Sequence, residues 1–568
     1  MSTTLRTDLT SALKYGLIGG AVALLVCLTG MVPEFSQRDI IADVISVGMT
    51  ILLLNWVALG YSTATRSFTH SGWLKVAYAA LAGLVISGIL AILVLLIENF
   101  NLQVMLVYAS PQLVEVLTFN QGVIPGIFYL LAAGLIAGAA GGVIEILPGR
   151  IRHAVTLGLT GVGLIGLLQQ LIQVTLSPYE FIIRATNFMF GSKVQTGLSL
   201  LGAITIFILV AGIDYLWGSF GPRVRSRVQA LPPSGRKNLR RGSLVALVLL
   251  VLYLPALLGV YLSEVNNQIG LFIMMALGLN IVVGFAGLLD LGYVAFYALG
   301  AYTVGVLTTT SGEIVFAPEL SFWVALPIAI FVAVMAGIIL GIPVLNMRGD
   351  YLAIVTLGFG EIIRILALSD WLKPYIGGSQ GIVLIPPPQI GNITLNTPQT
   401  LYYLVVAGIL VALFIAVRLR DSRLGRTWKA LREDEDVAQA MGVNLVVTKL
   451  LAFATGAALA GLAGAMLAPK LGTIYPHSFS LLISINVLAV IIVGGMGSVP
   501  GVFVGALILV GMPELLREFA EYRLMIYGAL LVVMMQVKPA GFWPEATHKR
   551  ELQVENDSAV AIDNEGNL

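Results

Sequence analysis

Residues 74–97 read LKVAYAALAGLVISGILAILVLLI and contain one charged residue, Lys75. A run of about 18 or more apolar residues is long enough to cross the hydrocarbon core of a bilayer as one helix. Such runs recur along a 568-residue chain that is 58% hydrophobic and 11% charged, whereas soluble domains are about 45–50% apolar and about 25% charged. The sequence therefore predicts an all-α, polytopic integral membrane protein.

About sixteen apolar runs are present, some short enough to be half-membrane helices. Six lie near 15–32, 40–60, 74–97, 123–147, 155–176 and 198–217. Ten more lie near 244–262, 269–289, 291–308, 321–345, 351–368, 401–418, 449–470, 480–494, 499–513 and 523–537. The first run has the length of a signal peptide, but no small-residue cleavage site precedes Pro33, and we expect it to be retained as a helix.

Four segments follow from these runs. Residues 1–217 are predicted to be an N-terminal membrane region of about six helices, whose role the sequence leaves open, and 244–543 a second membrane domain. Between them, 218–243 is a basic linker with seven Lys or Arg residues and no acidic one. Its prolines predict a poor helix, and its charge indicates a cytoplasmic anchor, with anionic lipid or nucleic acid as the alternative reading. The polar tail, 544–568, is predicted to be disordered.

Lys and Arg residues gather in the loops that follow even-numbered spans. Basic loops remain on the cytoplasmic side of a membrane. We therefore expect both termini, the linker and the loop after residue 418 to be cytoplasmic.

The loop at 419–447 holds most of the charge of the second domain, with eleven charged residues among the nineteen from Arg418 to Asp436. Helical periodicity places five apolar side chains on one face, namely Leu424, Trp428, Leu431, Ala438 and Met441. Gly425 and Gly442 predict a break at each end of this helix. It could lie flat on the membrane or be a solvated loop. Its acidic cluster and apolar stripe favour a third interpretation, a knob that inserts into a groove of another protein.

The same loop resembles the cytoplasmic "EAA" loop of permease subunits in bacterial ABC importers. The residues that carry this resemblance are Arg423, Gly425, Arg426, Ala430, Leu431, Arg432, Glu433, Asp434, Glu435, Ala438 and Gly442. The resemblance implies a coupling helix that docks on a separate ATP-hydrolysing subunit.

Four further stretches resemble the LivM type of branched-chain amino acid permease, in the LivH/LivM family. They are GLNIVVGFAGLLDLGYVAFYALGAYT (278–303), NMRGDYLAIVTLGFGEIIRI (346–365), GGSQGI (377–382) and VIIVGGMGSVPGVFVGA (490–506). The resemblance covers roughly 244–543 and leaves 1–241 as an addition. It implies a bacterial plasma membrane location, a LivH-like second permease, LivG- and LivF-like ATPases, and an extracytoplasmic amino-acid-binding protein.

Polar and glycine residues inside the spans mark a candidate translocation path. It comprises Asn280, Gly284, Gly287, Asp290, Gly292, Glu361 and Arg364. A helix broken at these glycines could aim backbone groups at a substrate, although Asp290 could simply lie in a turn and cap the next helix. Glu361 and Arg364 are spaced for a structural pair on one helix face, with contact to a zwitterionic substrate as the alternative.

Other motifs limit the chemistry. No Walker A string occurs, so we expect no cofactor on this chain, with ATP and Mg²⁺ on partner ATPases. The single cysteine and four separated histidines predict no metal site, and no catalytic constellation appears. The glycines of 494–501 would let two short spans meet. Gly134, Gly138 and Gly142 form a double GxxxG, for packing within the chain or, alternatively, dimerisation.

These patterns predict a permease subunit, not an enzyme, in contact with membrane lipid and with no nucleic acid partner. The expected cargo is a branched-chain or other neutral amino acid. A urea or short-amide permease of the same family is the alternative. A self-sufficient secondary transporter would need inverted repeats, and none is evident.

Overall fold

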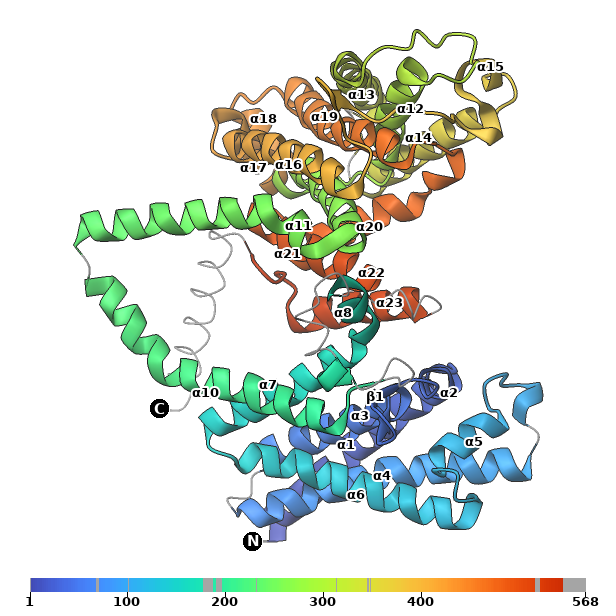
Figure 1. Cartoon of the computed structure of the whole chain (residues 1–568), viewed down its shortest axis with the longest axis vertical. Coiled ribbons are helices and arrows are strands. Elements are labelled where there is room, and N and C mark those ends of the chain that lie inside the picture. Colours follow the sequence, from blue (N-terminus) through green and yellow to red (C-terminus); the bar gives the residue numbers. More distant parts are fainter. Residues whose placement is uncertain are drawn as a thin grey trace. The chain divides into compact units, whose positions relative to one another are not determined.

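The computed structural model describes residues 2–67, 71–100, 102–176, 187–190, 197–230, 232–312, 314–344, 347, 349–515 and 522–544. These residues are almost entirely helical, which confirms the predicted fold class (Figure 1). Among them, eleven helices are long and apolar enough to cross a membrane, and two shorter apolar helices accompany them. The chain divides into two compact units, Met1–Val245 and Ala246–Leu568. Each unit is described by itself.

The first unit is a bundle with one small hairpin. Its long helices are α1 (Ser2–Leu28), α3 (Val47–Thr65), α4 (Gly72–Asn99), α6 (Val123–Ile146), α7 (Gly149–Leu167) and α10 (Leu200–Ala230). The shorter elements are α2 (Met31–Phe35), β1 (Asp39–Ile41), β2 (Ile45–Ser46), η1 (Leu102–Val104), α5 (Pro111–Leu117) and α8 (Gln169–Leu176). Strands β1 and β2 pair antiparallel.

Glycines bring α4 and α6 into close contact. A Cβ atom added at Gly83 of α4 would collide with the carbonyl oxygen of Gly134, and one at Gly138 would lie 3.0 Å from the Cα of Gly83. Small residues allow helix backbones to approach in this way. The double GxxxG of α6 therefore packs within the chain, as the intrachain interpretation predicted.

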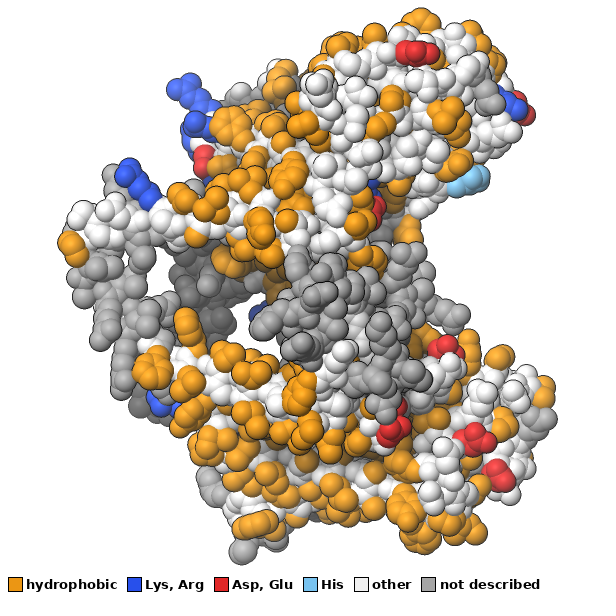
Figure 2. All heavy atoms as spheres, viewed as in Figure 1, with side chains coloured by type: hydrophobic (Ala, Val, Ile, Leu, Met, Phe, Trp, Pro, Cys, Tyr) orange, Lys and Arg blue, Asp and Glu red, His pale blue; other side chains and the backbone are white. Residues whose placement is uncertain are grey.

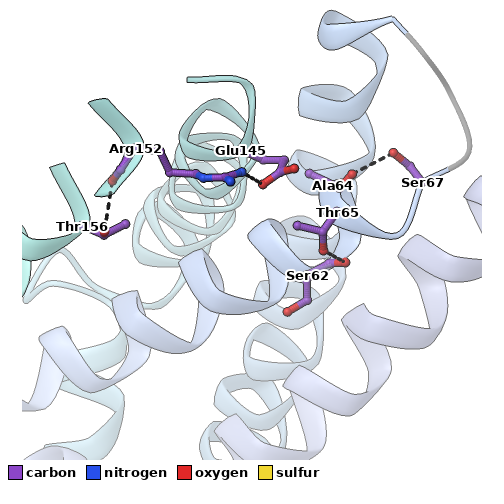
Figure 3. A network of polar contacts seen from close by, with 7 residues as sticks. All are labelled: Ser62, Ala64, Thr65, Ser67, Glu145, Arg152 and Thr156. Atoms are coloured by element: carbon purple, nitrogen blue, oxygen red, sulfur yellow. Dashed lines mark hydrogen bonds and ion pairs between the residues drawn. The ribbon is translucent and has the colours of Figure 1, made fainter. Parts of the chain in front are cut away.

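An ion pair joins α6 to α7 at the turn between them. Arg152 Nη1 lies 2.6 Å from Glu145 Oε2 (Figure 3). Both side chains are partly buried, so the pair neutralises a carboxylate near the end of an apolar helix. The Arg152 carbonyl oxygen also accepts a 3.0 Å hydrogen bond from Thr156 Oγ1.

The linker prediction was wrong about secondary structure. Helix α10 continues to Ala230, and α11 begins at Pro233, so most of 218–243 is helical. Proline is tolerated in the first turn of a helix, where its missing N–H has no intrahelical partner. Arg, Lys and Leu are good helix formers.

The second unit contains α11 (Pro233–Leu279), which begins within the first, followed by the π-helix η2 (Asn280–Phe285). Its other long helices are α12 (Val294–Thr308), α13 (Phe322–Val344), α14 (Asp350–Leu368), α16 (Pro398–Arg420), α19 (Leu445–Leu471), α20 (Leu481–Gly494) and α23 (Arg523–Val537). The shorter helices are α15 (Lys373–Ile376), η3 (Gly378–Gln380), α17 (Arg423–Glu433), α18 (Glu435–Ala440), η4 (Pro476–Ser478), α21 (Val499–Ala506), the π-helix η5 (Leu507–Gly511) and α22 (Met512–Leu515). Strands β3 (Gln389–Ile390) and β4 (Ile393–Thr394) form a second hairpin.

Two predicted spans, 244–262 and 269–289, are joined in α11, which is kinked at Gly259 (φ 70°). The polar stretch at 263–268, which separates the two predicted spans, has side chains that contact other helices. Asn267 Nδ2 donates to the Pro398 carbonyl oxygen at 2.9 Å, and Glu264 Oε1 lies 2.8 Å from Lys470 Nζ. These contacts with α16 and α19 hold polar side chains of the stretch inside the bundle, and the helix continues through them.

Helix α19 is the centre of the second unit. It is the most buried of the candidate spans, and α12, α13 and α16 pack against it. A Cβ atom added at Gly300 of α12 would lie 2.7 Å from the Cα of Gly461, so these backbones touch. Hydrophobic side chains cover much of the outer surface (Figure 2), as expected for helices that face lipid.

Candidate functional site

A helix break lies in the middle of the second unit. Helix α11 passes into η2, the chain leaves helical geometry at Gly287 (φ 72°), and α12 begins at Val294. The predicted break at Gly284–Gly292 is confirmed. Helix α12 has 15 residues, which makes it about 22 Å long.

Side chains from other segments satisfy the backbone of this break. Thr356 Oγ1 of α14 accepts a 3.0 Å hydrogen bond from the Leu291 amide. Ser484 Oγ of α20 accepts a 2.9 Å bond from the Val294 amide. Buried amides need such partners, so α14 and α20 hold the break in place. Sequence reasoning missed both residues, because nothing local distinguishes one buried hydroxyl from another.

Asp290 is fully buried in the turn between η2 and α12. Its Oδ1 accepts a 2.9 Å hydrogen bond from the Gly292 amide, so the turn interpretation is confirmed. The predicted cap is wrong, because Tyr293 occupies the N-cap position of α12 and makes no side-chain cap bond. Gly292 packs directly on the Thr356 carbonyl, which leaves no room for a side chain.

Asn280 connects the break to a second glycine-rich turn. Its Oδ1 accepts a 2.8 Å hydrogen bond from the Gly497 amide, between α20 and α21. Gly284 packs against the same Asn280 side chain. Gly494 and Gly501 bring α20 and α21 together, as predicted for this pair of short spans.

Glu361 and Arg364 form the predicted pair on one face of α14. Arg364 Nη2 lies 2.8 Å from Glu361 Oε2, and both side chains are about one-third exposed. Arg364 also lines a small pocket with Tyr302 of α12 and Phe479. Val294 and Ala295, which directly follow the break, line the same pocket, so the structure places Arg364 beside the break.

The charged loop is two helices and not one. Helix α17 ends at Glu433, and α18 begins at Glu435. Asp434 between them is extended, and its Oδ1 accepts 2.9 Å bonds from the amides of Asp436 and Val437. Asp434 is thus the residue at which α17 ends and the N-cap of α18. The prediction of a single helix in this loop was wrong. Gly425 lies inside α17, whereas Gly442 (φ 87°) follows α18.

The apolar stripe packs against the same chain. Trp428 is 0% and Leu431 5% exposed, and Trp428 Nε1 donates a 2.9 Å hydrogen bond to the Thr448 carbonyl oxygen of α19. Ala438 is buried as well, but Met441 is exposed. The predicted knob into another protein is therefore wrong for this stripe. Its periodicity was correct, but the surface that it covers belongs to α16 and α19.

A buried ion pair fixes the second half of the loop. Lys449, near the start of α19, is 2% exposed, and its Nζ lies 2.5 Å from Glu435 Oε1. A lysine is rarely so buried unless it is paired. Lysine at the start of an apolar run is a sequence signal that could have indicated this pair.

The remaining loop residues form an outward surface. Besides Arg432, its exposed members between Arg423 and Gly442 are Arg423, Arg426, Ala430, Glu433, Asp434, Asp436, Val437, Gln439, Ala440, Met441 and Gly442. We call this set the outer face of the loop. Beside it, the Arg420 guanidinium bonds Asp421 at 2.8 Å and lowers the pKa of that carboxyl. The outer face combines charges of both signs with exposed apolar side chains such as Val437 and Met441, and the buried side chains of α17 and α18 attach it to α19.

The Arg432 side chain is exposed too, but its guanidinium is bound to the helix break. Its Nη1 donates a 2.6 Å hydrogen bond to the Gly284 carbonyl oxygen, 148 residues away in sequence. The structure thus brings together two sets that were predicted separately, the coupling loop and the glycine break. Among the described residues, no group of three or more His, Cys, Asp or Glu side chains could hold a metal ion.

A family model described as "Branched-chain amino acid transport system / permease component" matches residues 261–535. The high-affinity branched-chain amino acid transport system permease protein LivM of Escherichia coli (strain K12) is 36% identical over 426 residues, 68% of this chain and 96% of the relative. LivM of Salmonella typhimurium is 40% identical over 389 residues, 61% of this chain and 89% of the relative. LivH of the same organism is 29% identical over 195 residues, 32% of this chain and 62% of the relative. No solved structure matches.

The match to the Escherichia coli relative is wider than the resemblance in the sequence indicated. Since 68% of this chain is longer than all of 244–568, the match takes in residues before 244. Family members are transport components and not enzymes. The chain is therefore a multi-pass membrane protein that belongs to the family of branched-chain amino acid transport system permease components.

Proposed function

We propose that this chain is the LivM-like permease subunit of an ATP-driven ABC importer for branched-chain or other hydrophobic amino acids. A LivH-like permease would complete the pore, and LivG- and LivF-like subunits would bind ATP and Mg²⁺. An extracytoplasmic binding protein would deliver the substrate. Both termini and the loop at 419–447 would face the cytoplasm, in line with the distribution of Lys and Arg.

The observation that carries this proposal is the construction of the coupling loop. Trp428, Leu431 and the Glu435–Lys449 pair fix α17 and α18 on α19, while charged residues such as Arg426 and Glu433 remain exposed. A surface of mixed charge suits a protein partner, because opposite charges set register and exclude wrong partners. ATP-driven movement of that partner would then reach the membrane helices through the loop.

The test is uptake into proteoliposomes that contain this chain, the LivH-like permease and the ATPase subunits. Binding protein loaded with labelled leucine, glycine or urea is added outside, with and without ATP. We expect leucine uptake that requires both ATP and the binding protein. Uptake by this chain alone, driven by an ion gradient, would replace the proposal with a secondary transporter, and urea uptake would change the cargo.

Two variants test the outer face of the loop. Glu433→Lys reverses a charge on that face, and Gly442→Trp places a bulky side chain where the backbone has positive φ. We expect both proteins to insert normally and to lose ATP-dependent uptake by about tenfold or more. Uptake at the wild-type rate, at equal expression, would contradict the coupling role.

A further inference from the structure

The contact between Arg432 and the helix break has a consequence beyond ATPase docking. We infer that Arg432, an exposed residue whose guanidinium is bound to the break, is a positioning residue that transmits movement of α17 to the break at 280–293, instead of binding the ATPase. This inference rests on the proposed function. It separates Arg432 from its neighbours in the loop, which the resemblance to the EAA loop treats as one docking unit.

Carbonyl oxygens at the C-terminal end of η2 need hydrogen-bond donors from outside the helix. The last carbonyl oxygens of a helix have no partner where the chain leaves helical geometry. Here the Leu288 amide bonds the Val282 carbonyl oxygen, and the chain turns away at Gly287. Arg432 Nη1 donates to the Gly284 carbonyl oxygen at 2.6 Å. A cation at the C-terminal end of a helix is doubly favourable, through a charge-assisted hydrogen bond and the helix dipole.

Arg432 also packs closely on Gly287. A Cβ atom added at Gly287 would lie 2.9 Å from Arg432 Cγ and 3.1 Å from its Cα. The contact thus involves the start of the Arg432 side chain and its backbone. Movement of α17 at this point must move the break or separate from it.

A displacement of the break would also move its neighbours, the turn between α20 and α21 and helix α14. Gly284 packs on Asn280, whose Oδ1 accepts the Gly497 amide of the α20–α21 turn at 2.8 Å. On the other side, Thr356 of α14 bonds Leu291. Helix α14 and the turn between α20 and α21 are therefore each joined by one hydrogen bond to the segment that Arg432 contacts. A contiguous packed network of this kind can carry coupling between distant sites.

Arg432→Gln is the principal variant, because it removes the charge and keeps a polar side chain. In proteoliposomes with all subunits, we expect leucine uptake per ATP hydrolysed to fall about tenfold, in line with loss of a charge-assisted hydrogen bond. Co-purification of the ATPases should stay within about twofold of wild type, because the outer face is unchanged. Arg432→Lys keeps a positively charged donor group and should retain part of the uptake that Arg432→Gln loses.

Arg426→Gln is the matched comparison, since it removes the same charge from another exposed arginine of the same helix. We expect it to weaken ATPase co-purification, which Arg432→Gln should not do. Gly287→Ala adds a Cβ atom to the break 2.9 Å from Arg432 Cγ. It should displace Arg432 and reproduce the Arg432→Gln phenotype. The double variant should be no worse than either single one, since both remove one interaction. Gly287→Ala also supplies the test if Arg432→Gln does not reach the membrane.

Two results would overturn the inference. One is loss of ATPase co-purification in Arg432→Gln to the same extent as in Arg426→Gln, which would place Arg432 on the docking surface. The other is unchanged uptake per ATP in both Arg432→Gln and Gly287→Ala. Failure of the proposed function looks different, because the wild-type chain itself would then retain no ATPase and show no ATP-dependent uptake.

Discussion

The indole Nε1 of Trp428 donates a 2.9 Å hydrogen bond to the carbonyl oxygen of Thr448, and this bond attaches α17 to the first turn of α19. The indole is fully buried. Burial of a large aromatic side chain and satisfaction of its single donor act together here. The loop that we propose as the coupling element is thus anchored from within its own chain.

Trp428→Phe should separate these two contributions. Phenylalanine keeps most of the apolar contact but lacks the donor, so we expect a loss of about 1–3 kcal/mol in the free energy of unfolding. Trp428→Ala also leaves a cavity and should cost about 3–5 kcal/mol. Thermal unfolding in detergent measures both. Trp371→Phe, at a side chain that is 77% exposed, is the control, and an equal shift in its Tm would argue against the anchor.

The Glu435–Lys449 pair should behave as a buried charge pair. Glu435→Gln leaves the Lys449 ammonium, 2% exposed, without its carboxylate, and we expect a cost of about 3 kcal/mol. Lys449→Met combined with Glu435→Gln removes the stranded charge. The double variant should be more stable than Glu435→Gln alone. If it is instead less stable, by the sum of the two single losses, the two groups do not interact.

Close approach of α4 and α6 should make Gly83 intolerant of a side chain. Gly83→Val would collide with the Gly134 backbone and should lower the Tm of the protein by several degrees, equivalent to about 2–3 kcal/mol. Gly88 lies on the same helix, and a Cβ atom there meets nothing within 4 Å. Gly88→Val should therefore change the Tm little. Similar Tm values for the two variants would contradict close packing of α4 on α6.

Deletion of residues 1–241 tests whether the first unit is an accessory. The coupling loop and the helix break both lie in the unit Ala246–Leu568, so we expect the shortened chain to retain the ATPase subunits. Co-purification from membranes measures this, with the Arg426→Gln form of the shortened chain as the negative control. If the shortened chain inserts but retains no ATPase, the first unit takes part in assembly.

The sequence predicted features that depend on composition and local spacing. The long apolar runs predicted an all-helical membrane protein, the glycines at 284–292 predicted a broken helix, and the spacing of Glu361 and Arg364 predicted their ion pair. Each of these rests on residues close together in the chain. The helical periodicity of Trp428 and Leu431 was equally local, and both do share one buried face.

Features that depend on distant partners could not be predicted in the same way. Periodicity showed that Trp428 would be buried but not against what. The polar stretch at 263–268 separated two predicted spans, because its partners Pro398 and Lys470 are more than a hundred residues away. Arg432 was assigned to the docking loop by its neighbours, whereas its bond to Gly284 depends on how the loop folds back. Asp434 broke the helix because its carboxylate bonds local amides more favourably than helix continuation allows.

The short length of α12 has a consequence for how the protein can move. At about 22 Å, it is shorter than a hydrocarbon layer of about 30 Å, and the irregular backbone before Val294 is packed inside the second unit, with Asp290 and Tyr293 buried. Its amides depend on hydroxyl groups of two separate helices, Thr356 of α14 and Ser484 of α20. Sliding of either helix alone would leave a buried amide without a hydrogen-bond partner, at a cost of about 1–3 kcal/mol. Rearrangements that keep α12, α14 and α20 together as one rigid body avoid that cost, and relative motion is cheapest at the edges of this group.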